Sequence, residues 1–151
     1  MEIVTVVTPL HVAQVRALFE EYWTSFGFTP CFQGFGEELT KLPGYYDRIW
    51  LATEDGEPAG CVALRALDTD RAEFKRLYVR PQFRGSGLGR KLLVQVVAAA
   101  RSGGYRELVC DTMPVMADAL AMYRRNGFQI TEPYSANSTP GAIYLRMALG
   151  S

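Results

Sequence analysis

The sequence predicts an α/β (α+β) fold in which strands and helices follow one another within a single domain of residues 1–151. Segments with the apolar period of a strand and segments with the period of a helix alternate along the chain. Their order is strand, two helices, three strands, helix, strand, helix and two strands. Hydrophobic residues make up 48% of the chain, enough for a sizeable core, and no linker or internal repeat divides it.

The boundaries of these elements come from turn and capping residues. Thr8-Pro9 is typical of a helix start, and Asp55-Gly56 indicates a hairpin between two strands. We expect strands over residues 2–8, 49–53, 60–67, 73–79, 107–111, 128–131 and 142–149. We expect helices over residues 9–25, 37–41, 88–102 and 114–125.

A glycine-rich turn follows the strand at residues 73–79 and opens the helix that begins at Leu88. Pro81 ends the strand, because it has no amide hydrogen to donate. The turn itself reads Arg84-Gly85-Ser86-Gly87-Leu88-Gly89. Such a turn directs several backbone N–H groups to one place at the positive end of a helix dipole. The segment therefore predicts an anion site, most often one for phosphate.

Several ligands suit a phosphate site, and the motif separates them in part. A nucleotide P-loop requires Gly-Lys-Ser/Thr, which is absent after this turn. The dinucleotide pattern Gly-x-Gly-x-x-Gly fits Gly85 and Gly87, with Asp111 at a suitable distance for a ribose contact. Arg90, however, takes the place of the third glycine. A plain surface turn before a core helix stays an alternative.

A third pattern fits without a mismatch, namely Arg/Gln-x-x-Gly-x-Gly/Ala at Arg84, Gly87 and Gly89. About 35 residues later stands Ala119-x-x-Met122-Tyr123-x-x-x-Gly127-Phe128. With the order of elements, these two motifs resemble the GNAT family of N-acetyltransferases across nearly the whole chain, in particular small bacterial members of unassigned substrate. The resemblance implies a mixed, mostly antiparallel sheet of six to seven strands flanked by about four helices.

The same resemblance implies acetyl-CoA as co-substrate and assigns residues to it. The turn would bind the pyrophosphate through Arg84, Gly85, Ser86, Gly87, Leu88, Gly89 and Arg90. The backbone of Leu77, Tyr78 and Val79 would pair with the pantetheine arm, because the family's fourth strand separates from its neighbour there. The Val79 N–H would then lie near the thioester carbonyl and stabilise the developing oxyanion.

Two side chains are candidates for proton transfer. Tyr123 is the expected acid for the departing thiolate, because a phenol has a pKa of about 10 and a thiol about 8.5; a core tyrosine is the alternative. Glu73 is the expected base for the acceptor ammonium, and an exposed carboxylate paired with Lys75 is the alternative. One position departs from the family pattern, since Met116 stands where an Asn often contacts the pantetheine.

Charge and cysteine content restrict the partners. Residues 1–70 hold 11 acids and 4 bases, whereas residues 71–151 hold 5 acids and 12 bases. The basic excess surrounds the turn and suits a polyanionic ligand, through Lys75, Arg76, Arg80, Arg84, Arg90 and Lys91. No nucleic-acid motif accompanies it. Three widely spaced cysteines match no metal pattern and favour a reducing cytoplasm, and no apolar run is long enough to span a membrane.

The resemblance implies an N-acetyltransferase that moves an acetyl group from acetyl-CoA to a primary amine by direct attack on the thioester. From the cysteines we expect it to be cytoplasmic and to use no metal. A non-catalytic acyl-CoA sensor on the same fold is the alternative. The acceptor is a small-molecule or protein amine, and acids such as Glu20, Glu21, Glu37 and Glu38 favour a cationic one. The loops at residues 28–36 and 132–141 would flank it, and a homodimer is compatible with the sequence.

Overall fold

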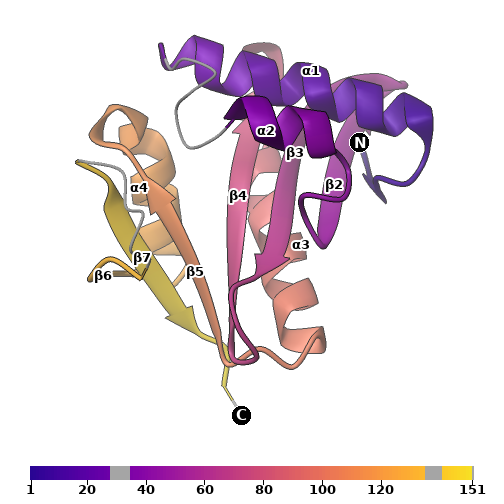
Figure 1. Cartoon of the computed structure of the whole chain (residues 1–151). Helices are drawn as coiled ribbons and strands as arrows, with labels where there is room; N and C mark the ends of the chain where they lie inside the picture. Colours follow the sequence, from indigo (N-terminus) through magenta and orange to yellow (C-terminus); the bar gives the residue numbers. More distant parts are fainter. Residues whose placement is uncertain (28–34, 135–140, 151) are drawn as a thin grey trace.

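A computed structural model describes residues 1–27, 35–134 and 141–150. Seven strands form one sheet in the order β1-β2-β3-β4-β5-β7-β6 (Figure 1). The strands are β1 (Glu2–Thr5), β2 (Arg48–Glu54), β3 (Glu57–Ala66), β4 (Arg71–Val79), β5 (Glu107–Thr112), β6 (Gln129–Thr131) and β7 (Ile143–Ala148). The helices are α1 (Pro9–Ser25), α2 (Phe35–Lys41), α3 (Leu88–Ser102) and α4 (Ala117–Arg125).

The sheet is antiparallel except where β4 pairs with β5. This parallel pair requires a crossover, and α3 supplies it. The hairpin between β2 and β3 turns through Asp55 and Gly56, whose φ angles are +51° and +81°, as expected for a two-residue turn of the Asp-Gly type. The predicted mixed, mostly antiparallel sheet with about four helices is confirmed.

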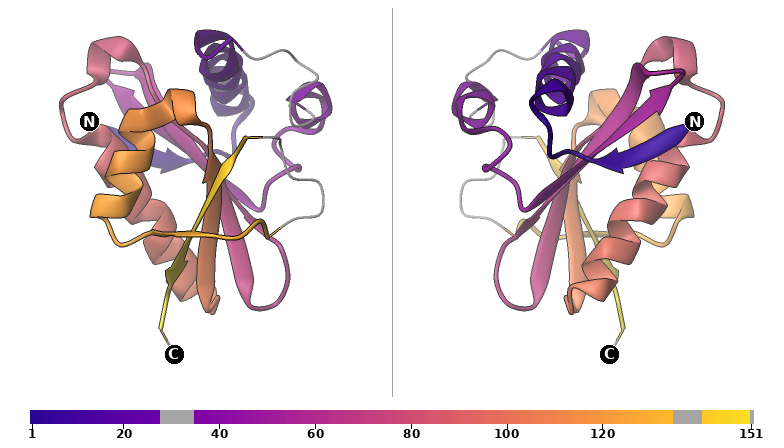
Figure 2. Two further views of the ribbon diagram at one scale, coloured as in Figure 1. Left: turned by 90° about the vertical axis from the view of Figure 1, so that its left-hand side faces the viewer. Right: turned by 90° about the vertical axis from the view of Figure 1, so that its right-hand side faces the viewer.

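Helices cover both faces of the sheet, with α1 and α2 on one face and α3 and α4 on the other (Figure 2). The core under α3 and α4 contains Leu92, Val96, Leu108, Tyr123 and Leu145 among others. A second core under α1 is built around Leu18, Phe19, Leu51 and Cys61. Each strand in the middle of the sheet is therefore buried on both sides.

Most predicted boundaries lie within a few residues of the observed ones. Thr8 caps α1 by accepting a hydrogen bond from the His11 amide at 3.1 Å, as its position before Pro9 predicts. The predicted helix over residues 114–125 is wrong at its start, because Pro114–Met116 forms a 3-10 turn and Met116 leaves helical geometry before α4. Among the described residues, no helix combines the length and apolar character needed to cross a membrane.

Candidate active site

The strands β4 and β5 separate in the middle of the sheet. Their pairing runs only from Arg71 opposite Glu107 to Glu73 opposite Val109, after which they diverge (Figure 1). A cavity of about 580 Å³ opens between them and reaches the start of α3 and the inner side of α4. Beyond Glu73, the edge of β4 that faces β5 therefore borders this cavity, while its other edge stays paired with β3.

A β-bulge precedes the cavity-lining end of β4. Lys75 lies opposite Ala63 and Tyr78 lies opposite Cys61. Two β4 residues, Arg76 and Leu77, therefore lie opposite the single β3 residue Val62. The bulge residue Arg76 has a φ of +59°. A left-handed conformation of a non-glycine residue costs of order 1–3 kcal/mol, so surrounding contacts must hold it.

The glycine-rich turn has the geometry of an anion cradle. Gly85 and Gly87 both have a φ of +83°, which side-chain-bearing residues rarely adopt. A Cβ at either position would meet no atom within 4 Å, so the space in front of the turn is open. Gly87 is the N-cap of α3, whose first amides lack partners within the helix. The turn is tied to β4 because Arg84 Nε donates to the Val79 carbonyl at 2.9 Å.

Gly60 on β3 allows this arrangement to close. A Cβ at Gly60 would lie 2.7 Å from the Tyr78 carbonyl oxygen and 3.2–3.3 Å from Leu88 and Leu92 of α3. The absence of a side chain therefore lets β4 and the start of α3 approach β3 closely. Sequence reasoning missed this position, because a glycine within a strand gives no local indication of what approaches it.

Most of the residues assigned to acetyl-CoA line the cavity. The β4 residues Leu77, Tyr78 and Val79 form one wall. The turn and the start of α3 contribute Arg84, Gly85, Gly87, Leu88, Gly89 and Arg90. Ser86 is outside the wall, and its hydroxyl instead donates to the Phe83 carbonyl at 2.7 Å. A contact of Ser86 with the ligand would thus involve its backbone amide.

Tyr123 lies in the cavity wall on α4. Its side chain is 5% exposed. Its ring packs edge-on against Phe74, with centroids 5.2 Å apart, and at a tilt against Phe128. Burial raises the pKa of Tyr123 well above 10. The phenol is therefore protonated at neutral pH and its hydroxyl can donate a hydrogen bond inside the cavity.

Glu73 is buried beside Arg65, Tyr134 and Lys75. It is 3% exposed, so the exposure expected in the alternative was wrong, although the pairing with Lys75 is present. One oxygen accepts from Arg65 Nε at 2.8 Å and the other from the Tyr134 hydroxyl at 2.5 Å, with Lys75 Nζ 3.9 Å away. Glu73 does not line the described cavity. Its assignment as the base stays a prediction, and a proton would have to reach it through another group or water.

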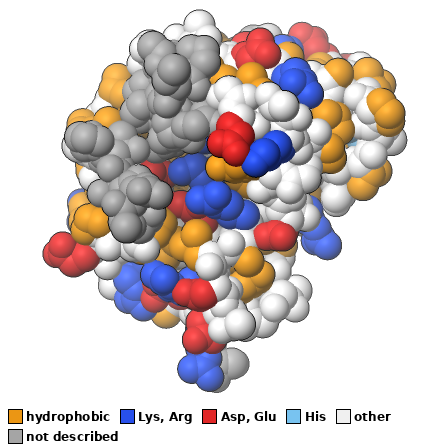
Figure 3. Space-filling view, in the orientation of Figure 1, with side chains coloured by type: hydrophobic (Ala, Val, Ile, Leu, Met, Phe, Trp, Pro, Cys, Tyr) orange, Lys and Arg blue, Asp and Glu red, His pale blue; other side chains and the backbone are white. Residues whose placement is uncertain are grey.

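Two charged residues that do line the cavity were not assigned to the acceptor side from the sequence. Lys75 Nζ lies 3.3 Å from Asp111 Oδ1, across the gap where β4 and β5 diverge. Figure 3 shows basic and acidic side chains together at the middle of this face. Asp111 was considered only as a ribose contact, because its spacing from the turn carries no information about the strand register that brings it to Lys75.

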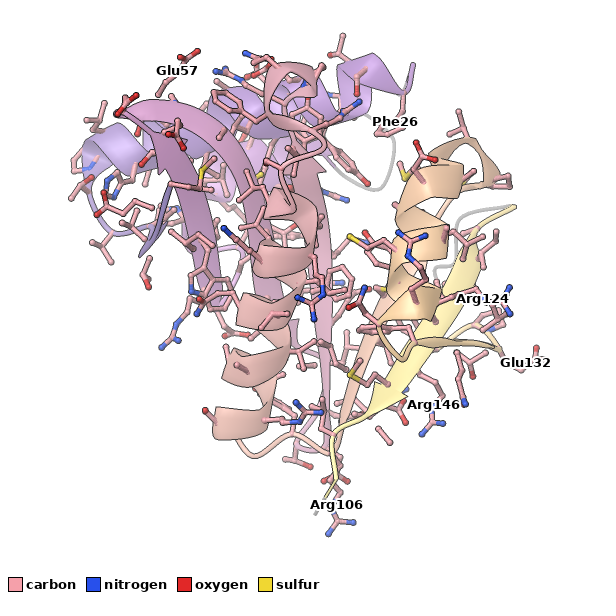
Figure 4. The ribbon with its side chains drawn as sticks, turned by 180° about the vertical axis from the view of Figure 1, so that it is seen from behind. Phe26, Glu57, Arg106, Arg124, Glu132 and Arg146 are labelled. Atoms are coloured by element: carbon pink, nitrogen blue, oxygen red, sulfur yellow. The ribbon has the colours of Figure 1, made fainter. Side chains whose placement is uncertain are left out.

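Aromatic side chains from α1 complete the wall on this face. Tyr22 and Phe26 both line the cavity, and Figure 4 shows Phe26 at the end of α1 on the side toward α4. Burial raises the pKa of Tyr22 to about 12. The acceptor loops predicted from the sequence fall largely on residues 28–34 and 135–140, which lie outside the described residues, as does Cys31.

Fewer basic side chains are available to a polyanionic ligand than the excess of bases around the turn predicted. Arg80 binds Glu21 through Nη2 at 2.7 Å and Arg76 binds Glu38 at 2.8 Å, and Lys75 is held by Asp111. These three side chains therefore form ion pairs within the protein. The arginines of the cavity wall near the turn are Arg84, Arg90 and Arg125. Glu21, Glu37 and Glu38 likewise lie in ion pairs and do not line the described cavity.

Met116 occupies the position where the resemblance led us to expect an Asn. It lines the cavity and is 7% exposed. Its sulfur accepts from the Thr112 hydroxyl at 3.4 Å and from the Tyr22 hydroxyl at 3.7 Å. A thioether donates no hydrogen bond, so this side chain lacks the amide donor that an Asn would offer at this position.

Comparison with known proteins agrees with this geometry. A family model described as the acetyltransferase (GNAT) family matches residues 13–128. An uncharacterized N-acetyltransferase of Schizosaccharomyces pombe is 33% identical over 147 residues, covering 93% of this chain and 90% of that protein. An aminoglycoside N(6')-acetyltransferase type 1 of Stenotrophomonas maltophilia is 42% identical over 123 residues, covering 75% of each.

Solved structures share the fold. An acetyltransferase from Streptococcus agalactiae superposes with a TM-score of 0.82 at 23% identity and 97% coverage of both chains. A GNAT family acetyltransferase from Elizabethkingia anophelis, solved with acetyl-CoA bound, gives a TM-score of 0.65 at 22% identity, again covering 97% of each.

Proposed function

Because this chain belongs to the acetyltransferase (GNAT) family, we propose that it transfers an acetyl group from acetyl-CoA to a primary amine by direct attack on the thioester. One observation carries the proposal. A single cavity connects the open glycine turn, the unpaired side of β4 and the buried hydroxyl-bearing ring of Tyr123. These are the parts required to bind a phosphate-bearing thioester and to protonate its leaving group.

The residues of the cavity fit acetyl-CoA by charge and shape. The amides of the turn and the start of α3, with Arg84 and Arg90, would hold the pyrophosphate. The backbone of Leu77, Tyr78 and Val79 would hold the pantetheine arm, and the Val79 amide would stabilise negative charge on the carbonyl oxygen. When bound, acetyl-CoA supplies the activated acyl group, and the protein supplies position and proton transfer.

Proton balance assigns the remaining roles. The acceptor nitrogen, arriving as an ammonium, loses two protons overall as the C–N bond forms and the C–S bond breaks. One of these protons would pass to Glu73 or the cavity-lining Asp111 and from there to solvent. The other would return to Tyr123 and replace the proton that Tyr123 donates to the departing sulfur. Of these two carboxylates, that of Asp111 lines the cavity and that of Glu73 does not.

The test combines binding and turnover. Calorimetry should detect acetyl-CoA binding, and a thiol reagent should detect CoA release in the presence of kanamycin, spermidine or a lysine-containing peptide. Kanamycin represents the acceptor class named for the aminoglycoside-acetylating relative. Binding without thiol release from any amine would favour the sensor. Stabilisation by NAD in place of acetyl-CoA would contradict both assignments.

A further inference from the structure

A buried ion pair joins α2 to β4 beside the cavity. Glu38 of α2 is 0% exposed and Arg76 of β4 is 3% exposed. Arg76 Nη2 donates to Glu38 Oε1 at 2.8 Å and its Nε donates to Oε2 at 3.1 Å, so both carboxylate oxygens are bound. Charged groups lose hydration on burial, so a pair this deep is sensitive to removal of either partner.

Arg76 is also the left-handed residue of the β4 bulge, with a φ of +59°. A side chain with a Cβ disfavours that conformation, and contacts from several elements hold Arg76 there. Its guanidinium lies over the Tyr22 ring of α1, 5.7 Å from the centroid. The Cys61 thiol of β3 donates to its carbonyl oxygen at 3.4 Å. Together with Glu38, these contacts fix the residue from three sides.

The bulge determines which way the following residues point. Residues of a regular strand alternate between the two faces, and one extra residue reverses this alternation for all that follow. Beyond Arg76, Leu77 and Val79 pack toward the core under α3, while Tyr78 packs toward the core under α1. Loss of the bulge would turn Leu77 and Val79 away from the position they take in the cavity wall.

We propose that Glu38 and Arg76 are positioning residues whose ion pair holds the β4 bulge in the conformation that binds acetyl-CoA. The inference rests on the proposed function, because the three residues after the bulge are those assigned to the pantetheine arm. It also assigns a role to α2. This short helix carries Glu38 to the strand from the face opposite α3, and so couples that face to the donor site.

Two uncharged double variants test the conformational part directly. Glu38→Gln/Arg76→Gly and Glu38→Gln/Arg76→Ala both remove the buried charges and differ by one methyl group. Glycine adopts a positive φ freely, whereas alanine disfavours it by a factor of about 5–30. Calorimetry on the folded proteins should show acetyl-CoA binding by the glycine variant within about fivefold of wild type. The alanine variant should bind at least about fivefold more weakly than the glycine variant.

Single variants test the pair itself. Glu38→Gln leaves the guanidinium without its carboxylate, so acetyl-CoA affinity should fall at least about tenfold in protein that circular dichroism shows to be folded. Glu37→Gln is the matched control, because Glu37 is on the same helix but is exposed and pairs with Lys41. Its affinity should equal that of wild type.

The outcomes separate the two proposals. Wild-type protein that does not bind acetyl-CoA would overturn the proposed function and this inference with it. Wild-type binding together with equal affinities of the glycine and alanine double variants would overturn the inference alone. If the double variants do not fold, Arg76→Lys decides. Lysine keeps the charge but not the two-point contact, so affinity should fall at least about threefold, and unchanged affinity would refute the role.

Discussion

Replacing Tyr123 by phenylalanine should lower the rate of acetyl transfer while leaving the fold and acetyl-CoA binding nearly unchanged. The ring contacts with Phe74 and Phe128 are kept, because they involve ring carbons alone. Among the described residues, no protein group forms a hydrogen bond with the Tyr123 hydroxyl. The free energy of unfolding should therefore change by less than about 1 kcal/mol, which for a domain of this size is a shift of about 2–4 °C in Tm.

The effect on turnover should be much larger. A positioned proton donor contributes about 10²–10⁴-fold to rate. The lower end of that range corresponds to about 2.7 kcal/mol of transition-state stabilisation, since each tenfold is 1.36 kcal/mol. We expect kcat to fall at least about 10²-fold, with the calorimetric Kd for acetyl-CoA changed no more than about threefold.

The assay is CoA thiol release under saturating acetyl-CoA with whichever amine supports turnover. Tyr105→Phe is the matched control, because Tyr105 is a partly buried tyrosine packed against the same core beyond the far end of α3. It should behave as wild type. A Tyr123→Phe rate within about threefold of wild type would show that Tyr123 only packs, because the expected loss is at least about 10²-fold.

Gly89→Glu should weaken acetyl-CoA binding at least about tenfold in calorimetry, because the added carboxylate would repel the pyrophosphate. It should not lower Tm, because a negative charge at the start of a helix is favourable. Gly87→Val should also lose binding, but valine at a φ of +83° would strain the backbone, so a loss of binding there has two possible causes. The Glu73→Gln variant should be slower than wild type at pH 7, and its rate should recover in part at pH 9, where a larger fraction of the amine is neutral. A variant-to-wild-type rate ratio that is constant with pH would move the base assignment to Asp111, with Asp111→Asn as the comparison. Because the pKa of Tyr123 is raised, the phenol stays protonated and able to donate below that pKa. We therefore expect kcat to show no decline caused by this residue between pH 7 and about 10. A decline in wild type that disappears in the Tyr123→Phe variant would contradict this.

Local patterns predicted the part of the site that local geometry determines. Gly85 and Gly87 adopt positive φ angles that few other residues accept, so these two glycines alone predict a turn at this place. The apolar period after Leu88 predicted α3, and the motif around Tyr123 predicted its inward position. These features depend on neighbours within one turn of chain.

Other features depend on segments that meet only in the folded protein. Glu38 and Arg76 are 38 residues apart, and nothing in either segment indicates that the other neutralises it. Glu73 reads as an exposed strand carboxylate until Arg65 and Tyr134 are placed beside it. The bulge at Arg76 is similarly hidden, because arginine is not a residue that predicts a positive φ.

Substitution of Gly60 should alter the binding site although this residue does not line the cavity. A Cβ at this position would lie only 2.7 Å from the Tyr78 carbonyl oxygen, so even alanine would force β4 away from β3. On the other side of β4 lies the cavity, so this movement would narrow the binding site from behind. In a saturation screen for loss of activity, position 60 would therefore behave like an active-site residue, although it lies behind the strand that forms the wall and against α3.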